Sequence, residues 1–124
     1  MCGIAGIVDH KGRHSRDELT RIAGLMADAM PYRGPDDRGV WVSPDGRCAL
    51  SHRRLSIIDT SSGGHQPFTG EAERFAITFN GEIYNYLELK RELEAAGHRF
   101  RTRSDTEVLL ALLTEHRERA FELL

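Results

Sequence analysis

Cysteine is scarce in this sequence, which has only Cys2 and Cys48 among its 124 residues. Two thiols cannot form the disulfide framework that stabilises small secreted domains, and no Cys-x-x-Cys pair suggests a metal site. Long apolar runs are also missing, and residues 1–10 lack the basic start and extended apolar stretch of a signal peptide. We therefore expect a cytoplasmic chain with reduced thiols, no bound metal and no membrane partner.

An excess of positive charge is absent as well. Lys and Arg number 17 against 19 Asp and Glu, which gives a formal net charge of −2. The alternating cluster Arg99, Arg101 and Arg103 is more typical of a solvated strand face than of a phosphate site. We therefore do not expect nucleic acid as a partner. A composition of 40% hydrophobic and 29% charged residues is typical of a globular domain, and the length allows one domain or part of one.

Helices are predicted from pairs of capping residues that lie three positions apart. The pairs are Ser15 with Glu18, Asn85 with Glu88, and Ser104 with Glu107. Apolar residues at helical spacing follow each pair, and Pro31 and Gly97 can end the first two helices. Short β-branched or aromatic runs predict strands at 3–8, 39–42, 49–51, 55–58, 75–79 and 100–103. This mixture predicts an α+β fold.

The sequence begins MCGIAGIVDH, so Cys2 directly follows the initiator methionine. A small side chain at this position normally permits removal of Met1, after which Cys2 carries a thiol and an α-amine on the same carbon. Such a residue can act as a nucleophile with its own base. Cys48 lies in GRCALSH, where a small apolar packing role is the simpler interpretation.

The stretch FAITFNGEIYN ends its apolar part abruptly at Asn80 and Gly81. An Asn-Gly pair is most often a hairpin turn. Alternatively, the Asn80 amide and the Gly81 N–H both donate hydrogen bonds, as an oxyanion hole requires. Taken alone, this motif favours the turn.

In LSHRRLSIID, adjacent arginines lie between short apolar runs. Neighbouring strand residues point to opposite faces, so one of Arg53 and Arg54 must face inward and needs a carboxylate partner. That partner can be Asp36, Asp37 or Asp59 in a structural ion pair, or a substrate carboxylate. The spacing alone does not decide between them.

Asp105 follows the predicted N-cap Ser104, and acids are common in the first helical turn because they interact favourably with the helix dipole. The run RGPDDRG is most simply a proline-containing turn. Ser62-Gly63-Gly64 is not followed by the acid and hydroxyl of a pyrophosphate-binding loop, so we do not predict a nucleotide site there.

A series of motifs, in the order MCGIAGIVD, YRGPDDRG, LSHRRLSIIDTSSGGHQPF, FNGEIYNYLEL and GHRFRTRSDTEVLLAL, closely resembles the amino-terminal glutaminase domain of glutamine-hydrolysing asparagine synthetases. This domain is a class II glutamine amidotransferase of the N-terminal-nucleophile hydrolases. The resemblance runs from residue 2 to about residue 113, and agreement over several ordered motifs is far more specific than any one of them. It implies part of a four-layer αββα sandwich, with residues 1–124 as a partial amidotransferase domain.

The resemblance implies catalytic roles for Cys2, Asn80 and Gly81. Cys2 matches the family's nucleophile, with its α-amine as the base, and Asn80 and Gly81 match the oxyanion hole. Hydrolysis of the glutamine side-chain amide would then proceed through a thioester and release ammonia and glutamate without a cofactor or metal.

The resemblance also implies how L-glutamine is bound. Arg54 matches the residue that binds the α-carboxylate, and Glu82 and Asp105 match the carboxylates that hold the α-ammonium. A zwitterionic substrate requires groups of both charges, and these positions supply them.

The family enzyme passes ammonia to a C-terminal synthetase domain, which activates aspartate with ATP and Mg²⁺. The residues up to Leu124 contain no such domain, and the family's glutaminase domain is longer than this sequence, which predicts a C-terminal truncation with an unpaired sheet edge. Homodimerisation is a further expectation. Two alternatives stay open, namely an inactive remnant or glutamine-binding fragment, and the amidotransferase half of an enzyme with a different ammonia acceptor.

Overall fold

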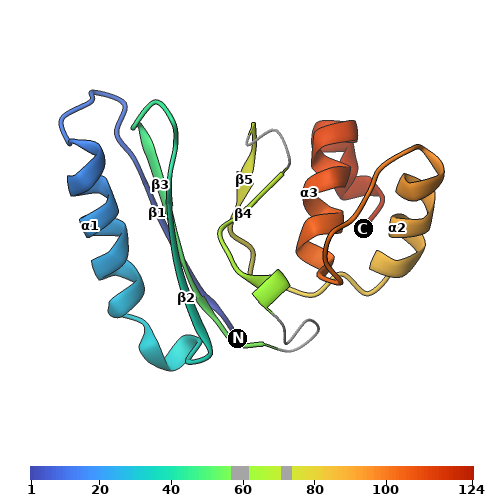
Figure 1. The fold of residues 1–124 in the computed structure, drawn as a ribbon, viewed down its shortest axis with the longest axis horizontal. Helices are drawn as coiled ribbons and strands as arrows, with labels where there is room; N and C mark the ends of the chain where they lie inside the picture. Colours follow the sequence, from blue (N-terminus) through green and yellow to red (C-terminus); the bar gives the residue numbers. More distant parts are fainter. Residues whose placement is uncertain (57–61, 71–73) are drawn as a thin grey trace. The chain divides into compact units, whose positions relative to one another are not determined.

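The computed structural model describes residues 1–56, 62–70 and 74–124, which form two units (Figure 1). The N-terminal unit comprises residues 1–56, 65–67 and 78–80, and the second unit comprises the described residues of 57–64, 68–77 and 81–124. Each unit combines helix with antiparallel strands, so the predicted α+β class is confirmed.

The N-terminal unit is a three-stranded antiparallel sheet with one helix on it. Its strands are β1 (Gly3–Val8), β2 (Asp37–Val42) and β3 (Cys48–Arg54), in the order β1-β3-β2. The central strand β3 pairs on both sides, with His52 opposite Ile4 of β1 and Gly39 of β2. Helix α1 (Arg16–Asp28) covers one face of this sheet (Figure 1).

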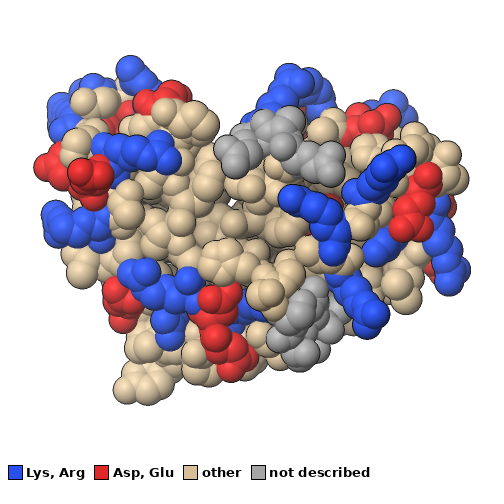
Figure 2. Space-filling view, in the orientation of Figure 1, with Lys and Arg blue, Asp and Glu red and all other residues tan. Residues whose placement is uncertain are grey.

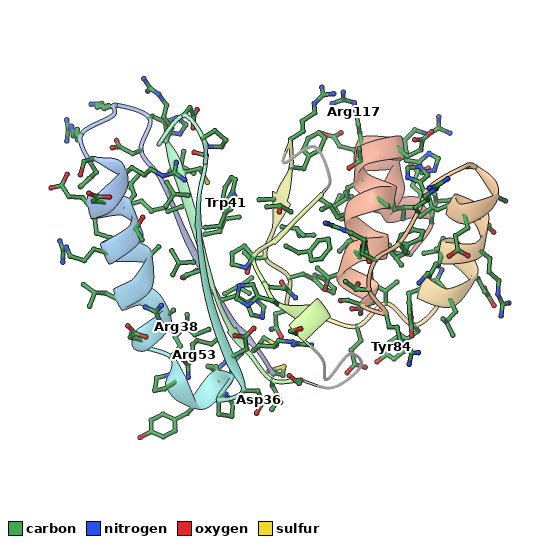
Figure 3. The ribbon with its side chains drawn as sticks, viewed as in Figure 1. Asp36, Arg38, Trp41, Arg53, Tyr84 and Arg117 are labelled. Carbon is green, nitrogen blue, oxygen red and sulfur yellow. The ribbon has the colours of Figure 1, made fainter. Side chains whose placement is uncertain are left out.

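The core of the N-terminal unit lies between α1 and the sheet. Leu19 and Ala23, one helical turn apart, pack with Val42 and Ala49 from the strands. Side chains alternate along β3, so those of 49, 51 and 53 face α1, and those of 48, 50, 52 and 54 lie on the opposite face. Figure 3 shows the same division, with Arg38 and Arg53 on the α1 side and Trp41 on the other.

Helix α1 begins with the predicted capping box. The Ser15 hydroxyl accepts a hydrogen bond from Glu18 N at 3.2 Å, and the Glu18 carboxylate accepts one from Ser15 N at 2.7 Å. This pair satisfies N–H groups that have no partner within the helix. The short 3₁₀ turn η1 (Pro31–Arg33) follows the helix.

The second unit contains the short strands β4 (Phe68–Thr69) and β5 (Ala76–Ile77), paired antiparallel, with helices α2 (Tyr86–Ala95) and α3 (Asp105–His116). The 3₁₀ turns η2 (Ser62–Gly64) and η3 (Arg117–Glu122) complete it. Helix α2 packs on α3, which also contacts both strands. The first half of α3 is buried, its polar residues Asp105, Thr106 and Glu107 as well as its apolar residues Val108, Leu109 and Leu110.

Several strand predictions were wrong. The expected strand 49–51 lies within the longer β3, but Leu55 and Ser56 of the expected strand 55–58 are not in a strand, and residues 57–58 lie outside the described residues. The expected strand 75–79 is reduced to β5, because Phe79 N donates to the Gln66 side chain at 2.6 Å. The strand β4 was not predicted.

The expected strand 100–103 is absent, and residues 101–103 form bends. The Glu107 carboxylate accepts hydrogen bonds from Arg101 N at 3.0 Å and Thr102 N at 2.7 Å, so a side chain occupies donors that a strand ladder would use. Glu107 therefore does not complete the predicted capping box, although Ser104 does cap α3 by accepting from Thr106 N. Asn85 makes no cap bond and its side chain donates to Leu123 O instead.

Charges of both signs are interspersed over the visible surface of the N-terminal unit (Figure 2). In the part of the chain that the structure describes, no helix has the length and apolar character needed to cross a bilayer.

Candidate functional site

The structure divides the predicted site residues between the two units. The N-terminal unit holds Cys2, Arg54 and Asn80, and the second unit holds Gly81, Glu82 and Asp105. Within the N-terminal unit, Cys2 and Asn80 are in direct contact. Within the second unit, Asp105 contacts the segment that carries Glu82.

Cys2 and Asn80 are 78 positions apart in sequence but joined by a hydrogen bond. Cys2 N donates to Asn80 Oδ1 at 3.0 Å. This bond fixes which side of the carboxamide faces Cys2 N, because Oδ1 accepts there and Nδ2 must point elsewhere as a donor. The arrangement orients an amide N–H₂ beside the N-terminal segment.

The Cys2 thiol lies against the backbone of Leu55, just beyond β3. Leu55 N donates to Cys2 Sγ at 3.3 Å, and the Cys2 thiol donates to Leu55 O at 3.6 Å. Both contacts are to one peptide backbone, so they fix the position of the sulfur at the end of β3. Sequence reasoning missed this contact because a backbone group carries no residue-type signal.

Arg53 and Arg54 lie on opposite faces of β3, as the strand alternation predicts. Arg54 is 8% exposed, on the face that also carries His52, and Asp37 of β2 is its cross-strand partner. Arg53 lies on the α1 side (Figure 3). Cys2 directly precedes Gly3, which pairs with Arg53, so strand alternation places Cys2 on the same face as Arg54.

The carboxylates proposed as arginine partners have other hydrogen bonds. Asp36 accepts from Ser56 N at 2.7 Å, and Asp37 accepts from His65 Nδ1 at 2.7 Å. Burial alone would raise the pKa of Asp37, but the hydrogen bond from His65, with the nearby Arg54 charge, holds that pKa below its usual value. Asp59 lies outside the described residues.

In the second unit, Asp105 opens α3 and is 6% exposed. Its Oδ2 accepts a hydrogen bond from Ile83 N at 3.1 Å. Asp105 thus anchors the chain at Ile83, directly after Gly81 and Glu82. Both Gly81 and Glu82 are exposed. The first-turn position is as the helix-dipole interpretation predicts, but the carboxylate also has this specific tertiary contact.

Three residues that the sequence did not single out, His52, Gln66 and Thr78, make hydrogen bonds along the segment that leads to Asn80. His52 Nδ1 is hydrogen bonded to Thr78 Oγ1 at 2.9 Å, and Gln66 Oε1 accepts from Phe79 N at 2.6 Å. Burial lowers the pKa of His52 to about 4, so its ring is neutral at pH 7. The sequence offered no signal for His52 or Gln66, because His52 follows an ordinary strand pattern and Gln66 lies in a turn-rich loop.

Cys48 lies at the opposite end of β3 from Arg54 and has a different environment from Cys2. Burial raises the pKa of its thiol, and the nearby Asp45 carboxylate adds to that increase. A thiol with a raised pKa is a poor nucleophile at neutral pH. This environment agrees with the packing role expected for Cys48.

The second unit also contains a cavity of about 480 Å³. It is lined by Phe68, Phe75 and Phe100, by arginines, and by Leu110 of α3. Among the residues that the structure describes, its lining includes no predicted site residue.

Known proteins match this chain over 90–100% of its length. A family model described as a glutamine amidotransferase domain covers residues 1–124. The chain is 43% identical over 120 residues to a glutamine-hydrolysing asparagine synthetase of Bacillus subtilis, covering 97% of this chain and 18% of that protein. The corresponding enzyme of Asparagus officinalis is 40% identical over 125 residues, which is 100% of this chain and 20% of that protein.

A protein named amidase chry2, from Gibberella zeae, is 38% identical over 120 residues, covering 90% of this chain and 18% of its own length. The chain therefore spans about a fifth of the length of these relatives. The α+β fold and the family match over residues 1–124 define an amidotransferase domain. The chain belongs to the glutamine amidotransferase domain family.

Proposed function

We propose that this chain hydrolyses the side-chain amide of L-glutamine, with Cys2 as the nucleophile. The observation that carries the proposal is the hydrogen bond from Cys2 N to Asn80 Oδ1, because it joins a potential nucleophile to a potential oxyanion donor across 78 positions of sequence. The membership of the chain in the glutamine amidotransferase domain family supports the choice of glutamine.

The reaction begins once Met1 has been removed. The Cys2 α-amine then takes the thiol proton, for which its ordinary pKa of about 8 is well matched. The thiolate attacks the side-chain carbonyl carbon of glutamine, and the oxyanion accepts hydrogen bonds from Asn80 Nδ2 and Gly81 N. Return of the proton to the leaving nitrogen expels ammonia and leaves a thioester on Cys2.

Water then completes the reaction. The α-amine takes a proton from the attacking water, a second oxyanion forms in the same position, and glutamate leaves as the thiol is restored. The net change is glutamine plus water to glutamate plus ammonia, which needs no metal or cofactor.

Substrate binding is proposed to use charges of both signs. Arg54 binds the α-carboxylate through its guanidinium, which can make two parallel hydrogen bonds to a carboxylate. Glu82 and Asp105 hold the α-ammonium. Asp105 is anchored at Ile83 N, so its position and that of the neighbouring Glu82 are coupled.

The ammonia is proposed to serve asparagine synthesis. Two of the relatives described above are named glutamine-hydrolysing asparagine synthetases, and this chain matches a part of each. On this proposal, a synthetase domain C-terminal to these residues receives the ammonia and uses ATP and Mg²⁺. A second candidate is that the same glutaminase chemistry supplies a different acceptor, and one relative that matches this chain is named an amidase and not a synthetase.

The test compares the two cysteines in the complete natural protein that carries these residues. We expect Cys2→Ala to abolish glutamate release from glutamine, because no other group replaces the nucleophile. Cys48→Ala is the matched control and is expected to keep most of the activity. Comparable losses in both variants, measured as initial rates of glutamate formation, would contradict the assignment of Cys2.

A further inference from the structure

Three consecutive residues, Thr78, Phe79 and Asn80, are each held by a hydrogen bond within the N-terminal unit. Thr78 Oγ1 bonds to His52 Nδ1 at 2.9 Å, and Phe79 N donates to Gln66 Oε1 at 2.6 Å. Asn80 Oδ1 accepts from Cys2 N at 3.0 Å. The segment before the amide is therefore fixed at two points by side chains that themselves make no described contact with Cys2.

His52 is fixed by the sheet on both sides. It is 1% exposed and lies in the central strand β3, with hydrogen-bonded strands on either side. A buried ring in the middle of a sheet has little rotational freedom, so its Nδ1 is a rigid anchor for Thr78.

Gln66 is held by a close approach of its backbone to β2. A Cβ atom built on Gly39 would lie 1.8 Å from Gln66 O, so only glycine at position 39 lets residues 65–67 lie this close to the strand. The Gln66 side chain then reaches Phe79 N from a fixed backbone. Two separate parts of the sheet thus determine where the segment 78–80 runs.

We propose that His52 and Gln66 are positioning residues, which hold the Asn80 carboxamide in the orientation needed to stabilise the oxyanion formed at Cys2. This inference rests on the proposed glutaminase function. Neither residue touches the substrate. Both act through Asn80, and the interaction they support is made in the transition state, so their loss should lower kcat more than it raises KM.

The test is a double-mutant cycle in the complete natural protein. Asn80→Ala is expected to lower kcat about 100-fold, the usual cost of losing an oxyanion donor. Thr78→Val removes the hydroxyl while keeping the side-chain shape, and is expected to lower kcat about tenfold with little change in KM. In the Asn80→Ala background, Thr78→Val should have no further effect, because the amide that it positions is already absent.

Further variants separate positioning from folding. His52→Leu and Gln66→Met remove the anchoring groups and should lower kcat as Thr78→Val does. His52→Asn keeps a polar atom at the place of Nδ1 and should recover much of the activity. Thr20→Val makes the same chemical change on α1, where Thr20 Oγ1 bonds only to Arg16 O among the described contacts, and should leave kcat unchanged.

The outcomes test the positioning role separately from the proposed glutaminase function. If Asn80→Ala lowers kcat but Thr78→Val keeps the wild-type rate, the positioning role is wrong and the glutaminase proposal stands. If Thr78→Val causes the same loss with and without Asn80, the residue acts by another route and the inference is overturned. If Asn80→Ala keeps the wild-type kcat, both the oxyanion role and the positioning role fail.

Discussion

Arg53 and Arg54 are adjacent in the sequence but lie in different surroundings. Arg54 is on the face of β3 that also carries His52, and Arg53 is on the face covered by α1. Their charges are the same, so a difference in their roles must come from orientation. Arg54 is the arginine that we propose binds the substrate α-carboxylate.

We expect Arg54→Lys to raise KM for glutamine about tenfold, since a guanidinium that makes two hydrogen bonds is replaced by a single ammonium. The value of kcat should change much less, because this binding is common to the ground and transition states. Arg53→Lys is the matched control and should leave KM nearly unchanged. Steady-state kinetics in which the two variants behave alike would show that the choice of Arg54 is wrong.

Met1 presents a second prediction at this scale. Cys2 N is a peptide nitrogen while Met1 is attached, and a peptide nitrogen cannot act as a base. We expect intact-mass analysis of active protein to show a chain that lacks Met1. Full glutaminase activity in a preparation proven to retain Met1 would contradict the proposed mechanism.

At the scale of elements, β2 and the segment 65–67 meet at Gly39. A methyl group at this position would overlap Gln66 O, as the separation of 1.8 Å shows. The strand cannot move away without breaking its register with β3, and the segment cannot move without shifting Gln66 Oε1 from Phe79 N.

We therefore expect Gly39→Ala to destabilise the protein by about 1–3 kcal/mol, as overpacking in a constrained site does. Gly70→Ala is the control, because its Cβ would lie at an ordinary 3.6 Å from Leu110 Cδ2. The urea midpoint of each variant measures the effect. Equal midpoints for Gly39→Ala and the unmodified protein would show that residues 65–67 can move without cost.

At the scale of the whole molecule, a buried neutral histidine links stability to pH. His52 has a pKa of about 4, lowered mainly by burial and also by Arg54 and His65, while Asp37 opposes the shift. An unfolded chain has a histidine pKa of about 6.5, so between these values the unfolded state binds a proton that the folded state does not. Stability is therefore complete above pH 6.5 and decreases as the pH falls toward 4.

The expected loss from this residue is roughly 3 kcal/mol over that interval. Folding also lowers the pKa values of Asp9, Asp28 and Asp37. These carboxylates stay ionised above about pH 4, so their effect on stability appears below that pH. Urea midpoints at pH 7, 5 and 4 should fall less for His52→Asn than for the unmodified protein, with His10→Asn as an exposed control. Equal slopes for the unmodified protein and His52→Asn would show that another group controls the acid transition.

Local sequence signals predicted much of the secondary structure. The Ser15 and Glu18 pair is the capping box of α1, and β1 spans Gly3–Val8 as expected. Gly97 follows α2 with a φ of 101°, a conformation that glycine adopts readily. These features depend on residues that are close in sequence, and so the sequence was sufficient to predict them.

The strand predictions that failed involve backbone N–H groups that donate to side chains and not to a neighbouring strand. Residues 100–103 have a plausible strand pattern, but Glu107 takes the N–H groups of Arg101 and Thr102. The strand expected to reach residue 79 ends early, because Gln66 takes Phe79 N. A strand pattern shows which face can be buried, but it does not show which acceptor reaches each backbone N–H.

The order of residues was sufficient for the α+β class, for the place of Cys2 directly after Met1, and for the family resemblance carried by ordered motifs. These follow from residue type and local spacing, and a family model that covers residues 1–124 confirms the resemblance. The tertiary structure alone decided that Cys2 N meets Asn80 Oδ1, that Leu55 N meets the Cys2 thiol, and that His52 and Gln66 hold the chain before Asn80. The physical reason is that these bonds join residues separated by 13 to 78 positions, so they exist only after sheet register and loop paths have brought the partners together.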